Sequence, residues 1–171
     1  MKSGPESLAV LLLEDNPVDA ELVIRKLKST DLHAIADVAR SASEFRERLQ
    51  QKTYDIILGD YRIPGWTGLD AVKWLRSSGN NTPFVLVTGT LGDELAIECL
   101  KSGVNDYVLK DNLERLPVAI RRLRAEVLEH PPTLSDDLEQ AASRVEILHV
   151  RLEMLRELVD SLGEERNLDF R

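Results

Sequence analysis

Apolar residues along the chain follow two alternating patterns, one typical of buried strands and the other of amphipathic helices. The first strand is predicted at Leu8–Leu13, where every residue is apolar, as in a strand buried on both faces of a sheet. Later runs predict four more strands, at Leu32–Val38, Tyr54–Leu58, Phe84–Val87 and Tyr107–Leu109. Helical spacing predicts five helices, at Val18–Leu27, Ser43–Leu49, Leu69–Leu75, Glu94–Leu100 and Leu113–Leu128. This alternation predicts an α/β fold with a doubly wound, five-stranded parallel sheet flanked by five helices.

Two consecutive prolines, Pro131 and Pro132, predict a domain boundary, because proline cannot continue a helix. The net charge is −3 over residues 1–132 and −5 over residues 133–171, so the composition changes there as well. We predict a flexible N-terminus (1–7), a globular domain (8–129), a proline-rich linker (130–133), a long helix (134–162) and a tail (163–171). The tail looks like the start of a further, sensor-type module.

The predicted C-terminal helix carries a heptad pattern. Its apolar residues are separated alternately by four and three positions: Leu134, Leu138, Ala141, Val145, Leu148, Leu152, Leu155, Val159 and Leu162. This spacing predicts a coiled coil, and a homodimer is its simplest form, because a lone helix of this length is marginal in water. A parallel dimer would set Arg151 against Arg156, so an antiparallel pair or a four-helix bundle stays open.

Composition and charge exclude several classes of protein. The 171 residues carry a net charge of −8, which argues against nucleic acid as the main partner, because phosphate binding needs clustered Lys and Arg. The single cysteine, Cys99, excludes a disulfide scaffold and favours a reducing compartment. The longest apolar runs fall far short of the ~18 residues of a membrane span, and no signal peptide precedes them. We expect a cytoplasmic protein with no membrane association.

Polar residues follow four of the predicted strands, at the point where each strand ends. They are Glu14 and Asp15, Asp60, Thr88, and Lys110. In an open parallel sheet, sites form beyond the carboxyl ends of the strands, where the strand order reverses. Three carboxylates gathered there repel one another and need a cation, and a hard divalent ion such as Mg²⁺ suits oxygen ligands.

Four motifs stand at these strand ends: Leu12–Pro17, Asp60–Gly65 with Gly68, Val87–Thr90, and Asp106–Lys110. In order, spacing and context they resemble the receiver domain of two-component response regulators, over roughly residues 7–128. The resemblance implies the strand order 2-1-3-4-5. It also implies a signalling module rather than an enzyme, regulated by transfer of a phosphoryl group.

Roles for individual residues follow from the same resemblance. Asp60 would be the phosphoacceptor, attacking the phosphohistidine of a sensor histidine kinase or phosphotransfer protein. Glu14, Asp15 and Asp60 would hold Mg²⁺ together with the backbone carbonyl of Arg62. Lys110 would pair first with Asp60 and then with a phosphoryl oxygen.

The resemblance also implies a switch. Thr88 would bond a phosphoryl oxygen, and the space that it vacates would admit Tyr107, so that the face of the fourth helix, fifth strand and fifth helix is remodelled. That face is a second expected surface for self-association. Without a structure, Tyr107 could equally be an aromatic residue of an edge strand that only packs.

Three positions depart from the usual receiver pattern. Asp111 follows Lys110 where most receivers have proline, Gly89 stands where alanine is usual, and Gly59 precedes Asp60 where a larger residue is common. We expect the two glycines to loosen the backbone around the site.

Two other functions use some of the same residues. A receiver-like scaffold or dimerisation module that phosphorylation does not regulate is the alternative, disfavoured by the complete set of site residues. A haloacid-dehalogenase-type phosphatase would need a second aspartate two residues after Asp60, and Arg62 stands there.

Overall fold

The computed structural model of the chain describes residues 7–89, 98–99 and 101–129. The chain divides into two units, residues 1–129 and 130–171, and the second lies outside the described residues. The predicted linker (130–133), coiled-coil helix (134–162) and tail (163–171) therefore stay predictions.

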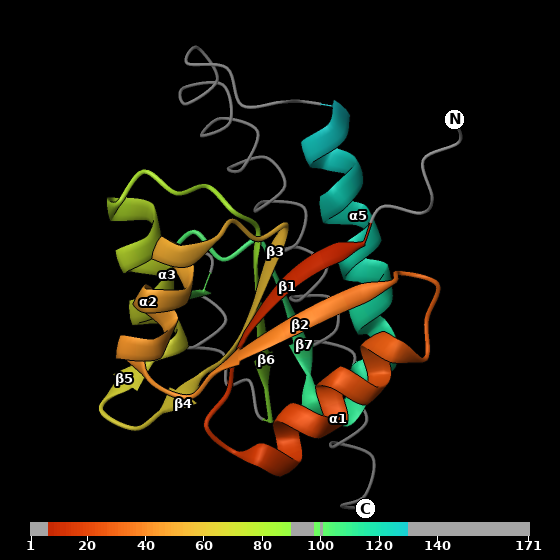
Figure 1. The fold of residues 1–171 in the computed structure, drawn as a ribbon, viewed down its shortest axis with the longest axis horizontal. Helices are drawn as coiled ribbons and strands as arrows, with labels where there is room; N and C mark the ends of the chain where they lie inside the picture. The colour runs from red at the N-terminus through yellow and green to blue at the C-terminus, as the bar shows by residue number, and fades with distance from the viewer. Residues whose placement is uncertain (1–6, 90–97, 100, 130–171) are drawn as a thin grey trace, which may run out of the picture. The chain divides into compact units, whose positions relative to one another are not determined.

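A five-stranded parallel sheet forms the centre of the described unit (Figure 1). Its strands are β1 (Leu8–Leu13), β2 (Ala34–Ala39), β3 (Ile56–Asp60), β6 (Phe84–Thr88) and β7 (Asp106–Leu109). They lie in the order β2-β1-β3-β6-β7, and every neighbouring pair is parallel. This is the predicted order 2-1-3-4-5, which brings the carboxyl ends of β1 and β3 side by side at the middle of one edge.

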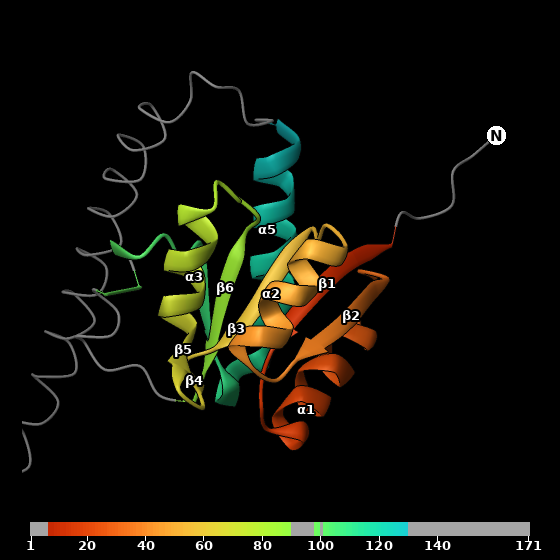
Figure 2. The same ribbon diagram turned by 60° about the vertical axis from the view of Figure 1, so that its left-hand side comes forward.

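Helices cover both faces of the sheet. They are α1 (Pro17–Lys28), α2 (Ala42–Gln51), α3 (Gly68–Ser77) and α5 (Leu116–Glu129), with a 3₁₀ segment, η1 (Lys110–Arg115), before α5. Figures 1 and 2 show α1 and α5 on one face and α2 and α3 on the other. Of the helix predicted at Glu94–Leu100, only Glu98 and Cys99 are described, and both are helical. No helix in the described part of the chain is long and apolar enough to cross a membrane.

The core forms two layers, one on each side of the sheet, and this explains the continuous apolar run of β1. Val10 and Leu12 face the layer that α1 and α5 complete, whereas Leu11 and Leu13 face the layer of α2 and α3. Because successive side chains of a strand point to opposite faces, a strand covered on both sides must be apolar at every position.

Two local elements differ from the predictions. No strand was predicted directly after β3, but that segment forms a small antiparallel hairpin of β4 (Arg62–Ile63) and β5 (Trp66–Thr67). Its turn contains Gly65 at φ 69°, a left-handed conformation that favours glycine. The last helix was predicted from Leu113, but residues 113–115 belong to the 3₁₀ segment η1, and α5 begins at Leu116.

Gly59 has a packing role that the sequence did not predict. It lies inside β3, and a Cβ atom at this position would come within 2.4 Å of the ring of Phe84, which is fully buried. The glycine is therefore required by the close approach of an aromatic ring.

Candidate functional site

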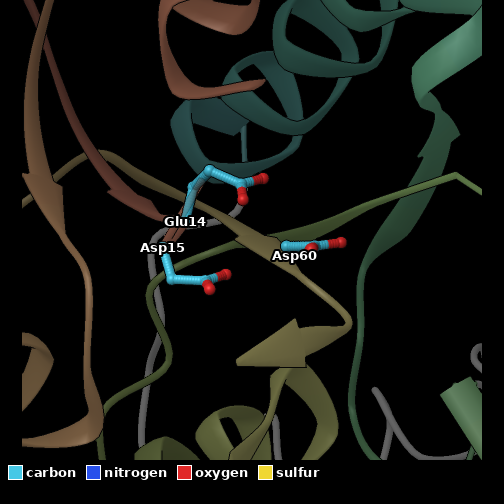
Figure 3. Close-up of side chains that lie close together, drawn as sticks. All are labelled: Glu14, Asp15 and Asp60. Carbon is cyan, nitrogen blue, oxygen red and sulfur yellow. The ribbon is translucent and has the colours of Figure 1, made fainter. Parts of the chain in front are cut away.

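Three carboxylates from two neighbouring strands lie beside one another at the carboxyl edge of the sheet (Figure 3). Glu14 and Asp15 directly follow β1, and Asp60 is the last residue of β3. One carboxylate oxygen from each lies within 4.8 Å of the other two. The strand pairing brings them together, because Leu13 is the partner of Gly59 in the adjacent strand.

Glu14 is buried, with a relative exposure of 2%. Its Oε2 accepts a hydrogen bond from Lys110 Nζ at 2.7 Å, and its Oε1 accepts one from the backbone N–H of Asn16 at 3.1 Å. Burial raises the pKa of Glu14, and the charge of Asp60 adds to this, while the bond from Lys110 opposes it. A cation at this position would relieve the cost of the buried charge.

Lys110 is the cation that the structure places among these acids. Its Nζ lies 2.7 Å from Glu14 Oε2 and 3.3 Å from Asp60 Oδ2, and its side chain is 14% exposed. Burial alone would lower the pKa of Lys110. The hydrogen bonds to Asp19 and Glu14 and the charge of Asp60 outweigh burial, so the pKa is raised. Lys110 is therefore held as an ammonium ion.

Asp60 presents its two carboxylate oxygens differently. Oδ1 accepts a hydrogen bond from the backbone N–H of Tyr61 at 2.7 Å, whereas Oδ2 lies toward Lys110. The Asp60 side chain is 12% exposed, so it opens to solvent only at the edge of the sheet.

Local structure fixes the chain on both sides of the acids. After β1, Asn16 caps α1 by accepting the backbone N–H of Val18 at 2.9 Å. After β3, the hairpin returns the chain to Gly68, whose N–H donates to the carbonyl of Tyr61 at 2.9 Å. A Cβ on Gly68 would lie 2.5 Å from the carbonyl oxygen of Asp60, so only glycine fits there without a shift.

Three other residues have predicted roles. Thr88 ends β6 and is buried, and the residue before it, Val87, pairs with Asp60. Tyr107 is half-buried in β7, with the guanidinium of Arg115 5.4 Å from the centre of its ring. Arg62 begins β4 two residues after Asp60, and its side chain is exposed.

The sequence interpretation missed two charged groups. Asp19, in the first turn of α1, accepts a hydrogen bond from Lys110 Nζ at 2.7 Å. Asp106 begins β7 and is buried, paired with Arg122 at 2.8 Å and with Arg115 at 3.3 Å. Asp19 follows no strand, and Asp106 stands in the motif Asp106–Lys110 without a role of its own, so the pattern of strand ends did not predict either one.

The donor set fits a hard divalent cation. All three donors are carboxylate oxygens, the kind of ligand that Mg²⁺ and Ca²⁺ take in proteins. Lys110 neutralises part of their charge but touches only Glu14 and Asp60 of the three. The charge of Asp15, which is half-buried, is left for a metal ion to balance.

Comparison with known proteins identifies the family. Residues 10–121 match the family model of the response regulator receiver domain, so the chain belongs to that family. It is 32% identical over 114 residues, 67% of its length, to the response regulator protein PilR of Pseudomonas aeruginosa, of which it covers 24%. It is 31% identical over 120 residues, 64% of its length, to the two-component response regulator ORR1 of rice, Oryza sativa, of which it covers 52%.

Solved structures show the same fold. The receiver domain of the Francisella response regulator 1452 superposes with a TM-score of 0.64 at 26% identity, covering 70% of this chain and 98% of that one. This chain spans only a quarter to about half of the length of the curated relatives named above. What these larger proteins do as wholes therefore enters only as a proposal.

Proposed function

We propose that this chain is a phosphorylation-dependent response regulator that accepts a phosphoryl group on Asp60 and signals by a change of conformation and self-association. The observation that carries the proposal is the meeting of Glu14, Asp15, Asp60 and Lys110 at one edge of the sheet. Family membership supports a donor that is a sensor histidine kinase or a phosphotransfer protein.

In the proposed reaction, a carboxylate oxygen of Asp60 attacks the phosphorus atom of the donor. An O–P bond forms, the P–N bond of phosphohistidine breaks, and the imidazole leaves with the bonding electron pair and takes up a proton. Lys110, 3.3 Å from Asp60, is placed to pair with the negative charge that accumulates on the phosphoryl oxygens.

We propose Mg²⁺ as the cofactor, held by Glu14, Asp15, Asp60 and the backbone carbonyl of Arg62. When bound, it would neutralise charge on the transferred phosphoryl oxygens. The fit rests on the three converging carboxylates and on the hairpin that follows Asp60 and contains Arg62.

The output would run through Thr88 and Tyr107. Thr88 is buried at the end of β6 and pairs with Leu109 of β7, the strand that also carries Tyr107. The Tyr107 ring lies under the guanidinium of Arg115, so a movement of Thr88 would be felt at this face. Hydrogen exchange tests the proposal: a phosphoryl mimic on Asp60 should change amide protection over β7 and the start of α5, and Thr88→Ala should remove that change.

Intact mass spectrometry tests the phosphorylation itself. Acetyl phosphate with Mg²⁺ should add one phosphoryl group, about 80 Da. Asp60→Asn should abolish the gain, whereas Asp31→Asn, which removes an exposed acid paired with Arg121, should retain it. If no donor adds mass to the wild-type chain, the alternative stands: a scaffold or dimerisation module that phosphorylation does not regulate.

We also propose that the predicted helix over residues 134–162 joins copies of the chain. The support is its heptad spacing. Light scattering should show more copies per particle for the full chain than for a chain shortened to end at Glu129. Equal association of the two would place the main contact elsewhere, and the face of β7 and α5 would be the next candidate.

A further inference from the structure

Lys110 Nζ faces three carboxylates, and Asp60 is the most distant of them. The distances are 2.7 Å to Glu14, 2.7 Å to Asp19 and 3.3 Å to Asp60. An ammonium group has three N–H donors, so each carboxylate can take one. The two short contacts hold Lys110 back from the residue that would be phosphorylated.

Asp19 differs from the other two partners in its place in the fold. Glu14 and Asp60 form the triad of converging carboxylates together with Asp15, whereas Asp19 lies outside it. It is in the first turn of α1, where the partial positive charge of the helix N-terminus stabilises a carboxylate. A cation bound by the triad would compete with Lys110 for Glu14 and Asp60, but it would leave Asp19 free to retain Lys110.

Short local hydrogen bonds fix Asp19 relative to the triad. Glu14 accepts the N–H of Asn16, and Asn16 in turn caps the first turn of α1 through Val18. The helix start is thereby tied to the end of β1. Asp19 is 32% exposed and Lys110 is 14% exposed, so the pair is only partly screened by water.

We propose that Asp19 is a positioning residue that withholds Lys110 from Asp60 until a phosphoryl group is present. The inference rests on the proposed function of Asp60 as phosphoacceptor. A phosphoryl group on Asp60 presents more negative charge than the carboxylate did, and it draws the Lys110 ammonium toward it. Since Lys110 is already 2.7 Å from Asp19, movement toward Asp60 weakens that contact. Asp19 therefore opposes the phosphorylated state and limits its population.

The test uses the full chain, Mg²⁺ and beryllofluoride, a phosphoryl mimic that does not transfer, with bound fluoride counted by ¹⁹F NMR. Asp19→Asn keeps the size of the side chain but removes its charge. The variant should bind beryllofluoride about two- to fivefold more tightly, the change expected for loss of a partly exposed ion pair that competes with binding. Asp19→Glu, which restores a carboxylate, should return the affinity toward that of the wild type.

Glu21→Gln is the matched control, since it removes one negative charge from the same helix at a residue that pairs with Arg25 and not with Lys110. It should bind as the wild type does. Equal tightening in Glu21→Gln and Asp19→Asn would overturn the inference, because a general effect of charge would then explain both. Unchanged or weaker binding by Asp19→Asn would overturn it too.

Folding of each variant is checked by its thermal unfolding, and Asp19→Ser serves in place of Asp19→Asn if that variant does not fold. Failure of the wild type to bind beryllofluoride would overturn the proposed function and this inference together. Normal binding by the wild type with no effect at Asp19 would overturn the inference alone.

Discussion

The ring of Phe84 occupies the space beside Gly59, one residue before Asp60. A Cβ atom on Gly59 would lie 2.4 Å from Phe84 Cζ, well inside van der Waals contact. Phe84 is fully buried in the neighbouring strand β6, so its ring cannot move aside without disturbing the core on the α2 and α3 side of the sheet. The end of β3 is thus fixed in place by packing beneath the acidic site.

Gly59→Ala is therefore expected to destabilise the protein by about 1–3 kcal/mol, the usual cost of overpacking a filled core. Urea unfolding monitored by circular dichroism measures it. Gly89→Ala is the control, because no heavy atom of the described residues beyond its chain neighbours lies within 4 Å of the place where its Cβ would be. Equal stability of Gly59→Ala and the wild type would show that the ring of Phe84 yields easily.

The central strands β1 and β6 were predictable because burial on both faces leaves a continuous apolar run. β1 was predicted with its observed bounds, Leu8–Leu13. β4 and β5 were not predictable, because strands of two residues have no periodicity to detect. The kink at Asn112 was hidden as well, since Leu113 and Leu116 are both buried and their spacing suits a 3₁₀ turn and an α-helix alike.

The triad of acids was predictable from the rule that parallel strands end at a common edge, together with the strand order that the resemblance implied. Glu14 and Asp15 follow β1, and Asp60 ends β3, its neighbour in the sheet. The contact of Asp19 with Lys110 was not predictable, because an acid in the first turn of a helix is common for a purely local reason, the helix dipole. Its link to Lys110 spans 91 positions in the sequence and appears only in the fold.

Arg122 is expected to stabilise the fold more than its neighbour Arg121. Its partner, Asp106, has a side chain that is 2% exposed, whereas the partner of Arg121, Asp31, has one that is 78% exposed. Arg122→Ala would leave the buried Asp106 with the longer ion pair to Arg115 as its remaining charged partner, beside the backbone N–H of Tyr107, at a cost of about 1–3 kcal/mol.

Arg121→Ala, on the same helix, should cost less than ~1 kcal/mol, because exposed ion pairs contribute little. Urea unfolding of the two variants side by side makes the comparison. Similar losses of stability would mean that the burial of Asp106 does not increase the contribution of its ion pair with Arg122 to stability.

Asp15→Asn is expected to raise the stability of the metal-free protein. Three carboxylates with oxygens within 4.8 Å repel one another, and Lys110 pairs with Glu14 and Asp60 but not with Asp15. Removing the Asp15 charge should add about 0.5–1 kcal/mol without Mg²⁺. It should also reduce the stabilisation that Mg²⁺ gives the wild type, because a ligand is lost.

Thermal unfolding with and without Mg²⁺ measures both effects. Glu21→Gln, on the exposed face of α1, is the control. It should not raise the stability of the metal-free protein, since it loses a pair with Arg25, and it should not reduce the stabilisation by Mg²⁺. An Asp15→Asn variant that Mg²⁺ stabilises as strongly as the wild type would exclude Asp15 from the metal site.

Tyr54 is expected to make stability fall at high pH. Its hydroxyl donates to Asp37 Oδ2 at 2.8 Å, and burial, together with that carboxylate, raises the pKa of Tyr54 from 10.0 to about 12. Between these two values the unfolded chain has lost the proton while the folded chain keeps it. Stability is therefore constant below pH 10 as far as Tyr54 is concerned, and it decreases as the pH rises toward 12.

Tyr54→Phe removes this proton and should flatten that part of the curve. At neutral pH the variant should lose only about 1 kcal/mol, because Asp37 retains Lys52 at 2.6 Å. Urea unfolding near neutral pH and between the two pKa values compares wild type and variant, and the ultraviolet absorbance of tyrosinate locates the ionisation directly. If the wild type and Tyr54→Phe lose stability in parallel above pH 10, the hydrogen bond to Asp37 does not hold the proton on Tyr54, and the decline belongs to other groups.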